Sequence, residues 1–283
     1  MVRMTDYKAS KRLIGTQTEL EALRYPATRS GDNSWGTSGG TNRMTYNWGT
    51  LPSTGTIALW IYFNAYSGYM RWFTSNAGSN VDGIVCENNY VLWGSGSSYT
   101  GIVDFKSSGF DTDKWYHVAF TWNTGSSGQL KTYLDGTYQN AQTDFSDYTH
   151  AMGATGGGLL GESNWTNRGT NGRMDNVTFY DIELSASQIS DLANGVDPNT
   201  IATNDLQVFY NMEQTGSTLT NVATGTGKIS ADGGTSGTVT KSLSSWEKEI
   251  TTGTNNLQAN SIFENTTNGK HYIWSGSAWT EVA

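Results

Sequence analysis

Residues 115–136 read WYHVAFTWNTGSSGQLKTYLDG, and this stretch decides the fold class. Its first eight residues alternate between two faces, and a period of two is typical of a β-strand. The residues NTGSSG tolerate turn geometry, and Asp135-Gly136 supplies a second turn signal after the return strand. The stretch therefore predicts a β-hairpin with one core-facing set of side chains, namely Tyr116, Val118, Phe120 and Trp122.

The composition bounds the class of protein. The 283 residues include 34 glycines and only 3 prolines, which suits many short strands joined by polar turns. The formal net charge of -8 argues against a nucleic-acid-binding protein, which usually carries a basic face. Cys86 is the only cysteine, so we expect neither an intrachain disulfide nor a structural zinc site. No apolar run reaches the length of a signal peptide or of a membrane helix, so we expect no membrane span.

The alternation continues on both sides of the hairpin. Residues 56–63 (TIALWIYF) carry bulky side chains on both faces, as a strand inside a sandwich does. Residues 205–213 resume the pattern after a gap, with Leu206, Val208 and Tyr210 on one face. Together with the turn spacing, these runs predict an all-β fold, an antiparallel two-sheet jelly-roll sandwich. Further short strands are expected at 69–75, 83–89, 90–95, 101–105, 157–163 and 172–181.

One helix is expected, in the segment LSASQISDLANG that begins at Leu184. Ser185 stands at the N-cap and Gln188 three residues later, which is the spacing of a capping box. Leu184 and Ile189 are spaced to form a hydrophobic staple across the first turn. Gly195 stands where the end of a helix favours a left-handed residue.

The chain is predicted to have four parts. Residues 1–33 form a basic N-terminal arm, which is either a flexible terminus or an attachment segment that orders against a partner. The sandwich extends over 34–213, including a strand that completes it from the C-terminal side. A turn-rich linker over 214–250 leads to a small β-hairpin module over 251–283.

Three pieces of sequence together resemble a known superfamily. They are LPSTGTIALWIYF, WYHVAFTWN…GQLKTYLDG and GRMDNVTFYDIELSASQISDLANG, in this order along residues 34–197. They resemble the early strand, the central hairpin and the closing strand with helix of the laminin-G-like, or concanavalin A-like, jelly-roll domains. The resemblance implies a lectin-like sandwich. The C-terminal IFENTTNGKHYIWSGSAWTEV is loosely similar to terminal segments of phage and virus structural proteins.

Catalysis is not expected, although some jelly rolls of this superfamily are glycosidases. A retaining glycosidase needs two carboxylates roughly 5 Å apart, which one strand supplies as E-x-D-x-x-E. The sequence holds no such motif, and Asp111 and Asp113 stand in a predicted turn. No G-x-S-x-G nucleophile elbow accompanies the three histidines, so a serine triad is equally unsupported.

Two places combine aromatic and polar side chains in the manner of a sugar-binding surface. The loop ESNWTNRGTNG places a tryptophan among amides and an arginine, and we expect it to be the first contact for a ligand. These residues are Trp165, Asn164, Asn167 and Arg168. A second candidate surface consists of Tyr90, Trp93 and Tyr99, with packing between the sheets as the alternative.

Calcium is common in the superfamily that the sequence resembles, where loop carboxylates and carbonyls bind it. The resemblance makes Asp82 and Asp175 candidate ligands. No EF-hand spacing supports them, so the sequence itself establishes no cofactor.

Three functions fit this pattern. The first is a virion or other extracellular-assembly protein that displays a lectin-like jelly roll for glycan or host-surface attachment. Its arm would then contact other copies of the chain or neighbouring assembly proteins. The second is a free carbohydrate-binding module of a prokaryotic secreted protein. The third is a glycosidase, which only the fold suggests. The first predicts a location in the virion or at the extracellular surface.

Overall fold

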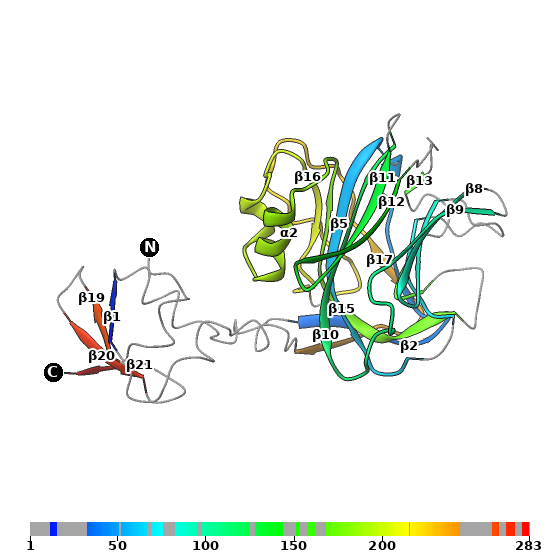
Figure 1. The fold of residues 1–283 in the computed structure, drawn as a ribbon. Coiled ribbons are helices and arrows are strands. Elements are labelled where there is room, and N and C mark those ends of the chain that lie inside the picture. The colour runs from blue at the N-terminus through cyan, green and yellow to red at the C-terminus, as the bar shows by residue number, and fades with distance from the viewer. Residues whose placement is uncertain are drawn as a thin grey trace. The chain divides into compact units, whose positions relative to one another are not determined.

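The computed structural model describes most of the chain between residues 12 and 282. The described residues are 12–15, 33–50, 52–66, 69–75, 83–95, 98–124, 128–143, 151–152, 158–161, 168–214, 216–243, 262–265, 270–274 and 279–282. The chain divides into two compact units (Figure 1), one of them Asn33–Ser244 and the other Met1–Asp32 together with Ser245–Ala283. Among the described residues, no helix is long and apolar enough to cross a membrane.

The unit Asn33–Ser244 is built from two layers of mostly antiparallel strands. The first layer has the strand order β12-β11-β10-β5-β15, followed by β2 and β16, which pair with different parts of β15. β18 then pairs with β2. The strands of this layer are β2 (Asn33–Gly40), β5 (Thr54–Phe63), β10 (Trp115–Asn123), β11 (Gln129–Leu134), β12 (Thr137–Thr143), β15 (Gly169–Tyr180), β16 (Leu206–Tyr210) and β18 (Thr240–Leu243).

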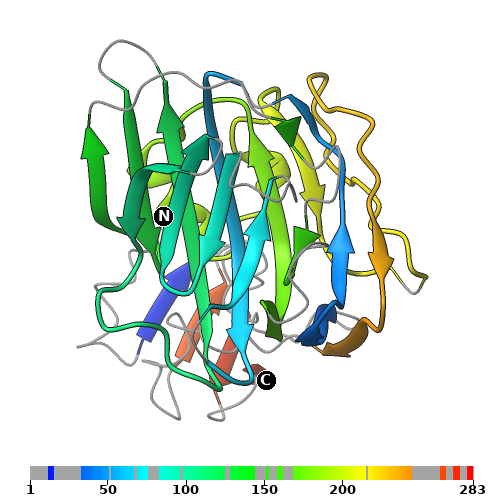
Figure 2. The same ribbon diagram turned by 90° about the vertical axis from the view of Figure 1, so that its right-hand side faces the viewer.

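The second layer faces the viewer in Figure 2, where its cyan strands lie in front of the blue and green strands of the first layer. Its strand order is β9-β8-β7-β6-β14-β3-β17. The short pair β4–β13 lies outside this order. The strands are β3 (Arg43–Thr45), β4 (Gly49–Thr50), β6 (Arg71–Thr74), β7 (Gly83–Glu87), β8 (Tyr90–Ser95), β9 (Ser98–Asp104), β13 (Ala151–Met152), β14 (Gly158–Leu159) and β17 (Gly234–Ser236).

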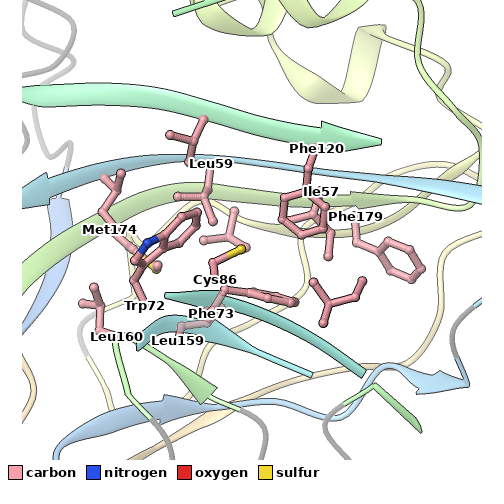
Figure 3. Packing of buried hydrophobic residues seen from close by; sticks show 14 of the residues in the cluster. Ile57, Leu59, Trp72, Phe73, Cys86, Phe120, Leu159, Leu160, Met174 and Phe179 are labelled. Atoms are coloured by element: carbon pink, nitrogen blue, oxygen red, sulfur yellow. The ribbon is translucent and has the colours of Figure 1, made fainter. Parts of the chain in front are cut away.

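The core between the layers is rich in aromatic side chains (Figure 3). Phe120 is buried there as expected, with its ring 5.8 Å from that of Phe73 in the opposite layer. The indole of Trp122 stays buried because its Nε1 donates to the carbonyl oxygen of Pro52 at 2.9 Å. Its ring also occupies the space where Gly55 on β5 would carry a Cβ, so only glycine fits there. The all-β jelly-roll sandwich predicted from the sequence is therefore confirmed.

The single α-helix of the described residues, α2 (Ala186–Ala193), has the predicted cap. The hydroxyl of Ser185 accepts from the backbone N–H of Gln188, whose side chain accepts from the N–H of Ser185 at 2.9 Å. At the other end, the N–H groups of Gly195 and Val196 donate to the carbonyls of Leu192 and Asp191, which is a Schellman motif. A 3-10 turn, η2 (Pro198–Thr200), follows the helix.

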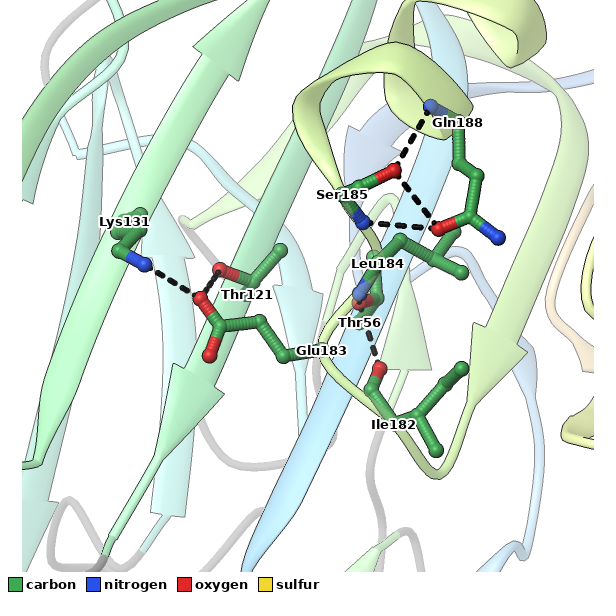
Figure 4. Close-up of polar contacts among 8 residues, drawn as sticks. All are labelled: Thr56, Thr121, Lys131, Ile182, Glu183, Leu184, Ser185 and Gln188. Carbon is green, nitrogen blue, oxygen red and sulfur yellow. Dashed lines mark hydrogen bonds and ion pairs between the residues drawn. The ribbon is translucent and has the colours of Figure 1, made fainter.

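A strap of three residues, Ile182–Leu184, fastens this helix to the first layer (Figure 4). The hydroxyl of Thr56 on β5 donates to the carbonyl of Ile182 at 2.8 Å and accepts from the N–H of Leu184 at 2.9 Å. Glu183 pairs with Lys131 on β11 at 2.5 Å. The helix therefore covers part of the outer face of the first layer.

Two sequence predictions about this unit were wrong. The segment 214–250, predicted as a linker, belongs to the sandwich as far as Leu243, because β17 and β18 pair with β3 and β2. Leu206 was placed on the face of Val208 and Tyr210, but it packs in the cluster under the helix. A register shift opposite this strand, between Phe179 and Tyr180, turns Leu206 to the other face.

The terminal unit joins the two ends of the chain in one small sheet. β1 (Arg12–Gly15), from the predicted arm, pairs in parallel with β19 (Ile262–Asn265). β20 (His271–Trp274) and β21 (Trp279–Val282) continue the sheet in antiparallel fashion. The predicted arm and the predicted C-terminal hairpin module are therefore parts of one structural unit.

Candidate binding surface

The second layer presents a row of polar side chains on its outer face. In β7, Ile84 and Cys86 belong to the core, so Glu87 points outward by alternation. Residues paired directly across antiparallel strands share a face, which extends the row across four strands. The paired residues are Arg71 on β6, Glu87 on β7, Tyr90 on β8 and Asp104 on β9, called here the polar row.

The turn between β7 and β8 fixes the centre of the polar row. Asn88 takes a positive φ of 54° there, a conformation that asparagine tolerates better than most residues. Its side-chain oxygen accepts from the N–H of Met70 at 3.0 Å, and its carbonyl accepts from Nε1 of Trp72 at 2.9 Å. The turn is thus anchored to β6, which holds Glu87 and Tyr90 beside each other at the surface.

One end of the polar row is a network of charges. Oε2 of Glu87 accepts from Nε of Arg71 at 2.8 Å and from Nη1 of Arg168 at 3.1 Å. The guanidinium of Arg168 also lies 5.4 Å from the ring centroid of Tyr69, a cation–π distance. Tyr69 is 64% exposed and has a φ of 70°. A largely exposed aromatic ring therefore stands beside a fixed arginine.

The other end of the polar row is an aromatic ring with hydrogen-bonding groups around it. Tyr90 is 40% exposed, so part of its ring faces solvent. Asp104, its neighbour across the strands, accepts from Nδ2 of Asn140 at 2.6 Å. Such a combination can stack on the C–H face of a sugar and bind its hydroxyls through carboxylate and amide groups.

The structure brings two of the predicted binding residues together. Arg168 and Tyr90 were predicted on separate surfaces, yet both now adjoin Glu87, one by an ion pair and one by strand pairing. Trp165, Asn164 and Asn167 lie outside the described residues, so their role stays a prediction.

Trp93 was wrongly placed on a binding surface. It is fully buried between the layers, where its ring lies 5.9 Å from that of Trp122. The reason is alternation within β8. Tyr90 faces outward, so Val91 and Trp93 face the core.

Calcium ligation by Asp175 is not supported by its surroundings. Its side chain is buried, and Oδ1 accepts from the N–H of Asn176 at 2.7 Å, next to the bulge of β15. Within the part of the chain that the structure describes, no group of three or more His, Cys, Asp or Glu side chains is arranged to hold a metal ion. The other candidate, Asp82, lies outside the described residues.

Tyr69 and Glu87 were not identified from the sequence. A charged residue that precedes Asn-Asn in a predicted hairpin was a usable signal for Glu87, because such a residue flanks the turn. Tyr69 gave no comparable signal, since its exposure depends on a positive φ that tyrosine rarely adopts.

Comparison with known proteins gives the family. The model of the concanavalin A-like lectin/glucanases superfamily matches residues 36–190, which is more than half of the chain. The chain therefore belongs to this superfamily. A search of curated protein sequences finds no match.

Two solved structures share the fold. One is a Bacteroides ovatus protein whose assignment to carbohydrate binding is provisional, with a TM-score of 0.54 and 16% identity over 75% of this chain. The match spans 60% of that protein's length. The other is a heptameric SAP-like pentraxin from Limulus polyphemus, with a TM-score of 0.52 and 14% identity, covering 78% of this chain and 99% of the pentraxin. At these identities the likeness concerns the fold alone.

Proposed function

We propose that this chain is a non-catalytic carbohydrate-binding protein and that the polar row is its contact surface. The observation that carries the proposal is the half-exposed ring of Tyr90, flanked in register by Glu87 and Asp104. Tyr69 and Arg168 extend the same surface with a second exposed ring and a fixed donor. Membership of a superfamily of lectins and glucanases supports a glycan as the ligand.

The spacing within the polar row favours binding over hydrolysis. Glu87 and Asp104 lie two strands apart, and neighbouring strands are about 4.8 Å apart, so the two positions are separated by roughly 10 Å. A retaining glycosidase needs its carboxylates about 5 Å apart, and an inverting one about 6.5–9.5 Å. Glu87 also accepts hydrogen bonds from two guanidinium groups. These bonds suit a carboxylate that serves as a hydrogen-bond acceptor and not as a catalytic acid.

Replacing Tyr90 with alanine tests this proposal. Loss of the ring should weaken glycan binding about tenfold or more, which corresponds to roughly 1.4 kcal/mol. Tyr138 is a matched control, because it is 51% exposed but lies on β12 of the first layer, where it pairs with Tyr133 on β11. Isothermal titration calorimetry with ligands identified on a broad glycan array measures both variants.

The possible results either support or contradict the proposal. Weakened binding for Tyr90→Ala and unchanged binding for Tyr138→Ala support the proposal. Equal affinities in all three proteins, or no binding by the unmodified protein across the array, contradict it. Trp165→Ala belongs in the same series, since the sequence predicts a tenfold loss with almost unchanged thermal stability.

The setting of this activity is a separate proposal. A virion or another extracellular assembly would display the lectin-like unit, with the terminal unit making the assembly contacts. The division of the chain into two compact units supports such a separation of roles. The alternative is a free carbohydrate-binding module.

Truncation distinguishes these settings. If the terminal unit assembles the chain, the full chain is oligomeric and a chain limited to Asn33–Ser244 is monomeric but still binds glycan. Light scattering coupled to size-exclusion chromatography measures both masses. A monomeric full chain would favour the free module.

A further inference from the structure

A second row of residues crosses the outer face of the first layer, four positions along β5 and β10 from the alanines that α2 covers. Strand pairing places Thr240, Gly36, Arg173, Tyr62 and Trp115 side by side on β18, β2, β15, β5 and β10. These residues share one face, because each is directly paired with the next. The row is called here the arginine row, and it lies on the layer opposite to the polar row.

The guanidinium of Arg173 is held over aromatic rings. It lies 4.3 Å from the ring centroid of Tyr62 and 5.6 Å from that of Trp115. Its aliphatic stem lies over Gly36, at the place where any other residue would carry a Cβ. The side chain is thus positioned by contacts along its whole length, and stacking leaves the two Nη groups for hydrogen bonding.

Arg173 has no carboxylate partner among the described residues, whereas Arg71 and Arg168 share Glu87. Its Nε is buried without a hydrogen-bond acceptor. Two carboxylates in this part of the layer have hydrogen-bond donors of their own. Asp113 accepts from the hydroxyl of Tyr62 at 3.1 Å, and Asp175 accepts from the N–H of Asn176. A stacked arginine without a counter-ion is suited to receive one from a ligand.

The pKa of the Tyr62 hydroxyl reflects the charges of both Arg173 and Asp113. Loss of hydration raises its pKa first, and the carboxylate of Asp113 raises it further, while the positive charge of Arg173 acts in the opposite direction. Arg173 and Asp113 therefore act on one hydroxyl with opposite signs. A ligand that carries both a carboxylate and hydroxyl groups can contact Arg173 with the carboxylate and Asp113 with a hydroxyl.

Amide groups lie next to the arginine row on the same face. Asn171 stands two residues before Arg173 on β15, so both side chains point outward. Its Oδ1 accepts from Nδ2 of Asn64 at 3.0 Å, which leaves the second N–H of Asn64 and the amino group of Asn171 for other acceptors. These groups suit the hydroxyls of a sugar.

We propose that the arginine row is a second binding site, in which Arg173 receives the carboxylate of a sugar acid such as a hexuronate. A planar carboxylate matches the fork of a guanidinium in a bidentate contact. Asp113, Asn64 and Asn171 would bind hydroxyls of the same sugar ring. The inference rests on the proposed function only in taking a saccharide as the ligand, and its site and its chemistry are distinct from those of the polar row.

The test compares charged and neutral forms of the same sugars. Glucuronate, galacturonate and mannuronate, each with its methyl ester, are titrated into the full chain while the side-chain NMR signals of arginine are followed. The acids should shift the Arg173 signals to saturation, and the esters should not, because esterification removes the charge and one oxygen acceptor. Arg173→Lys should weaken binding of the acid about tenfold or more, since lysine keeps the charge but loses the fork.

Arg43→Lys is the matched control, because Nε of Arg43 is likewise buried without an acceptor but the residue lies on β3 of the other layer. It should leave binding of the acids unchanged. No shift of the Arg173 signals with any of the three acids, or equal affinity of acid and ester, would overturn the inference. Tyr90→Ala separates the two sites, because it should affect neutral glycans and leave the shifts at Arg173 intact.

Discussion

The two outer faces of the sandwich follow the same alternation but differ in what covers them. On the first layer, Ala58 and Ala119 are paired across β5 and β10, and their small side chains leave room for the apolar face of α2. On the second layer, the polar row places bulky and charged side chains at the equivalent outward positions. Small side chains therefore mark the part of an outer face that the helix covers, whereas half-exposed aromatic rings mark an open surface.

The largest expected effect comes from the core, which both layers share. Phe120→Ala should lower the free energy of unfolding by about 3–5 kcal/mol, the usual cost of truncating a buried phenylalanine. The ring lies close to aromatic side chains from both layers, so its loss weakens the packing between the layers. Urea denaturation measures the change. A loss below about 1 kcal/mol would show that the two layers do not share one core.

His117, on the covered side of the sandwich, should make stability depend on pH. Burial lowers its pKa from 6.5 to about 3, and within the described residues its Nδ1 has no hydrogen-bond partner. Below pH 6.5 the unfolded chain therefore binds a proton that the folded chain does not. Stability should fall as pH decreases from 6.5, by about 1.4 kcal/mol per pH unit, and by about 3 kcal/mol at pH 4.5.

His117→Leu should flatten this dependence. The carboxyl of Asp135 lies nearby, and its pKa, raised first by desolvation, acts with the opposite sign. Because Asp135 is present in both proteins, the difference between them isolates His117. Urea denaturation at pH 7 and pH 4.5 measures both. Equal slopes in the two proteins would mean that His117 takes up its proton in the folded state.

The next largest loss of stability is expected when the strap that fastens α2 is weakened. Thr56→Val keeps the shape of the side chain but removes the hydroxyl that bonds to both Ile182 and Leu184. Two backbone groups then lose their partner in a buried place, so stability should fall by about 1–3 kcal/mol. Thr137→Val on β12 is a control at an exposed strand position. Similar small losses in both variants would mean that the strap contributes nothing to holding the helix.

Much of the covered face could be predicted from the sequence, because local patterns determine it. The alternation of β10 and the capping box at Ser185 are each contained in a few neighbouring residues. The polar row could not be predicted to the same extent. Arg71, Glu87 and Arg168 come from three distant segments, and only the pairing of β6 with β7 and the position of Arg168 bring their charges together.

The smallest expected changes in stability come from two glycine substitutions, one on each face. Tyr69 on the open face and Asp135 on the covered face both have a positive φ, at 70° and 48°, where glycine is less strained than other residues. Asp135 also accepts a hydrogen bond from the N–H of His117 at 2.9 Å, while the ring of Tyr69 is exposed. Asp135→Gly should therefore cost about 1 kcal/mol of stability.

Tyr69→Gly should instead leave stability within about 0.5 kcal/mol, because relief of backbone strain offsets the lost contact with Arg168. Its effect should appear in glycan binding, which loses one of the two exposed rings. Thermal unfolding measures the stability of the two variants, and calorimetric titration measures their affinity for glycan. If Tyr69→Gly lowers stability as much as Asp135→Gly and leaves binding unchanged, the ring of Tyr69 serves packing, and the polar row has no binding role at that end.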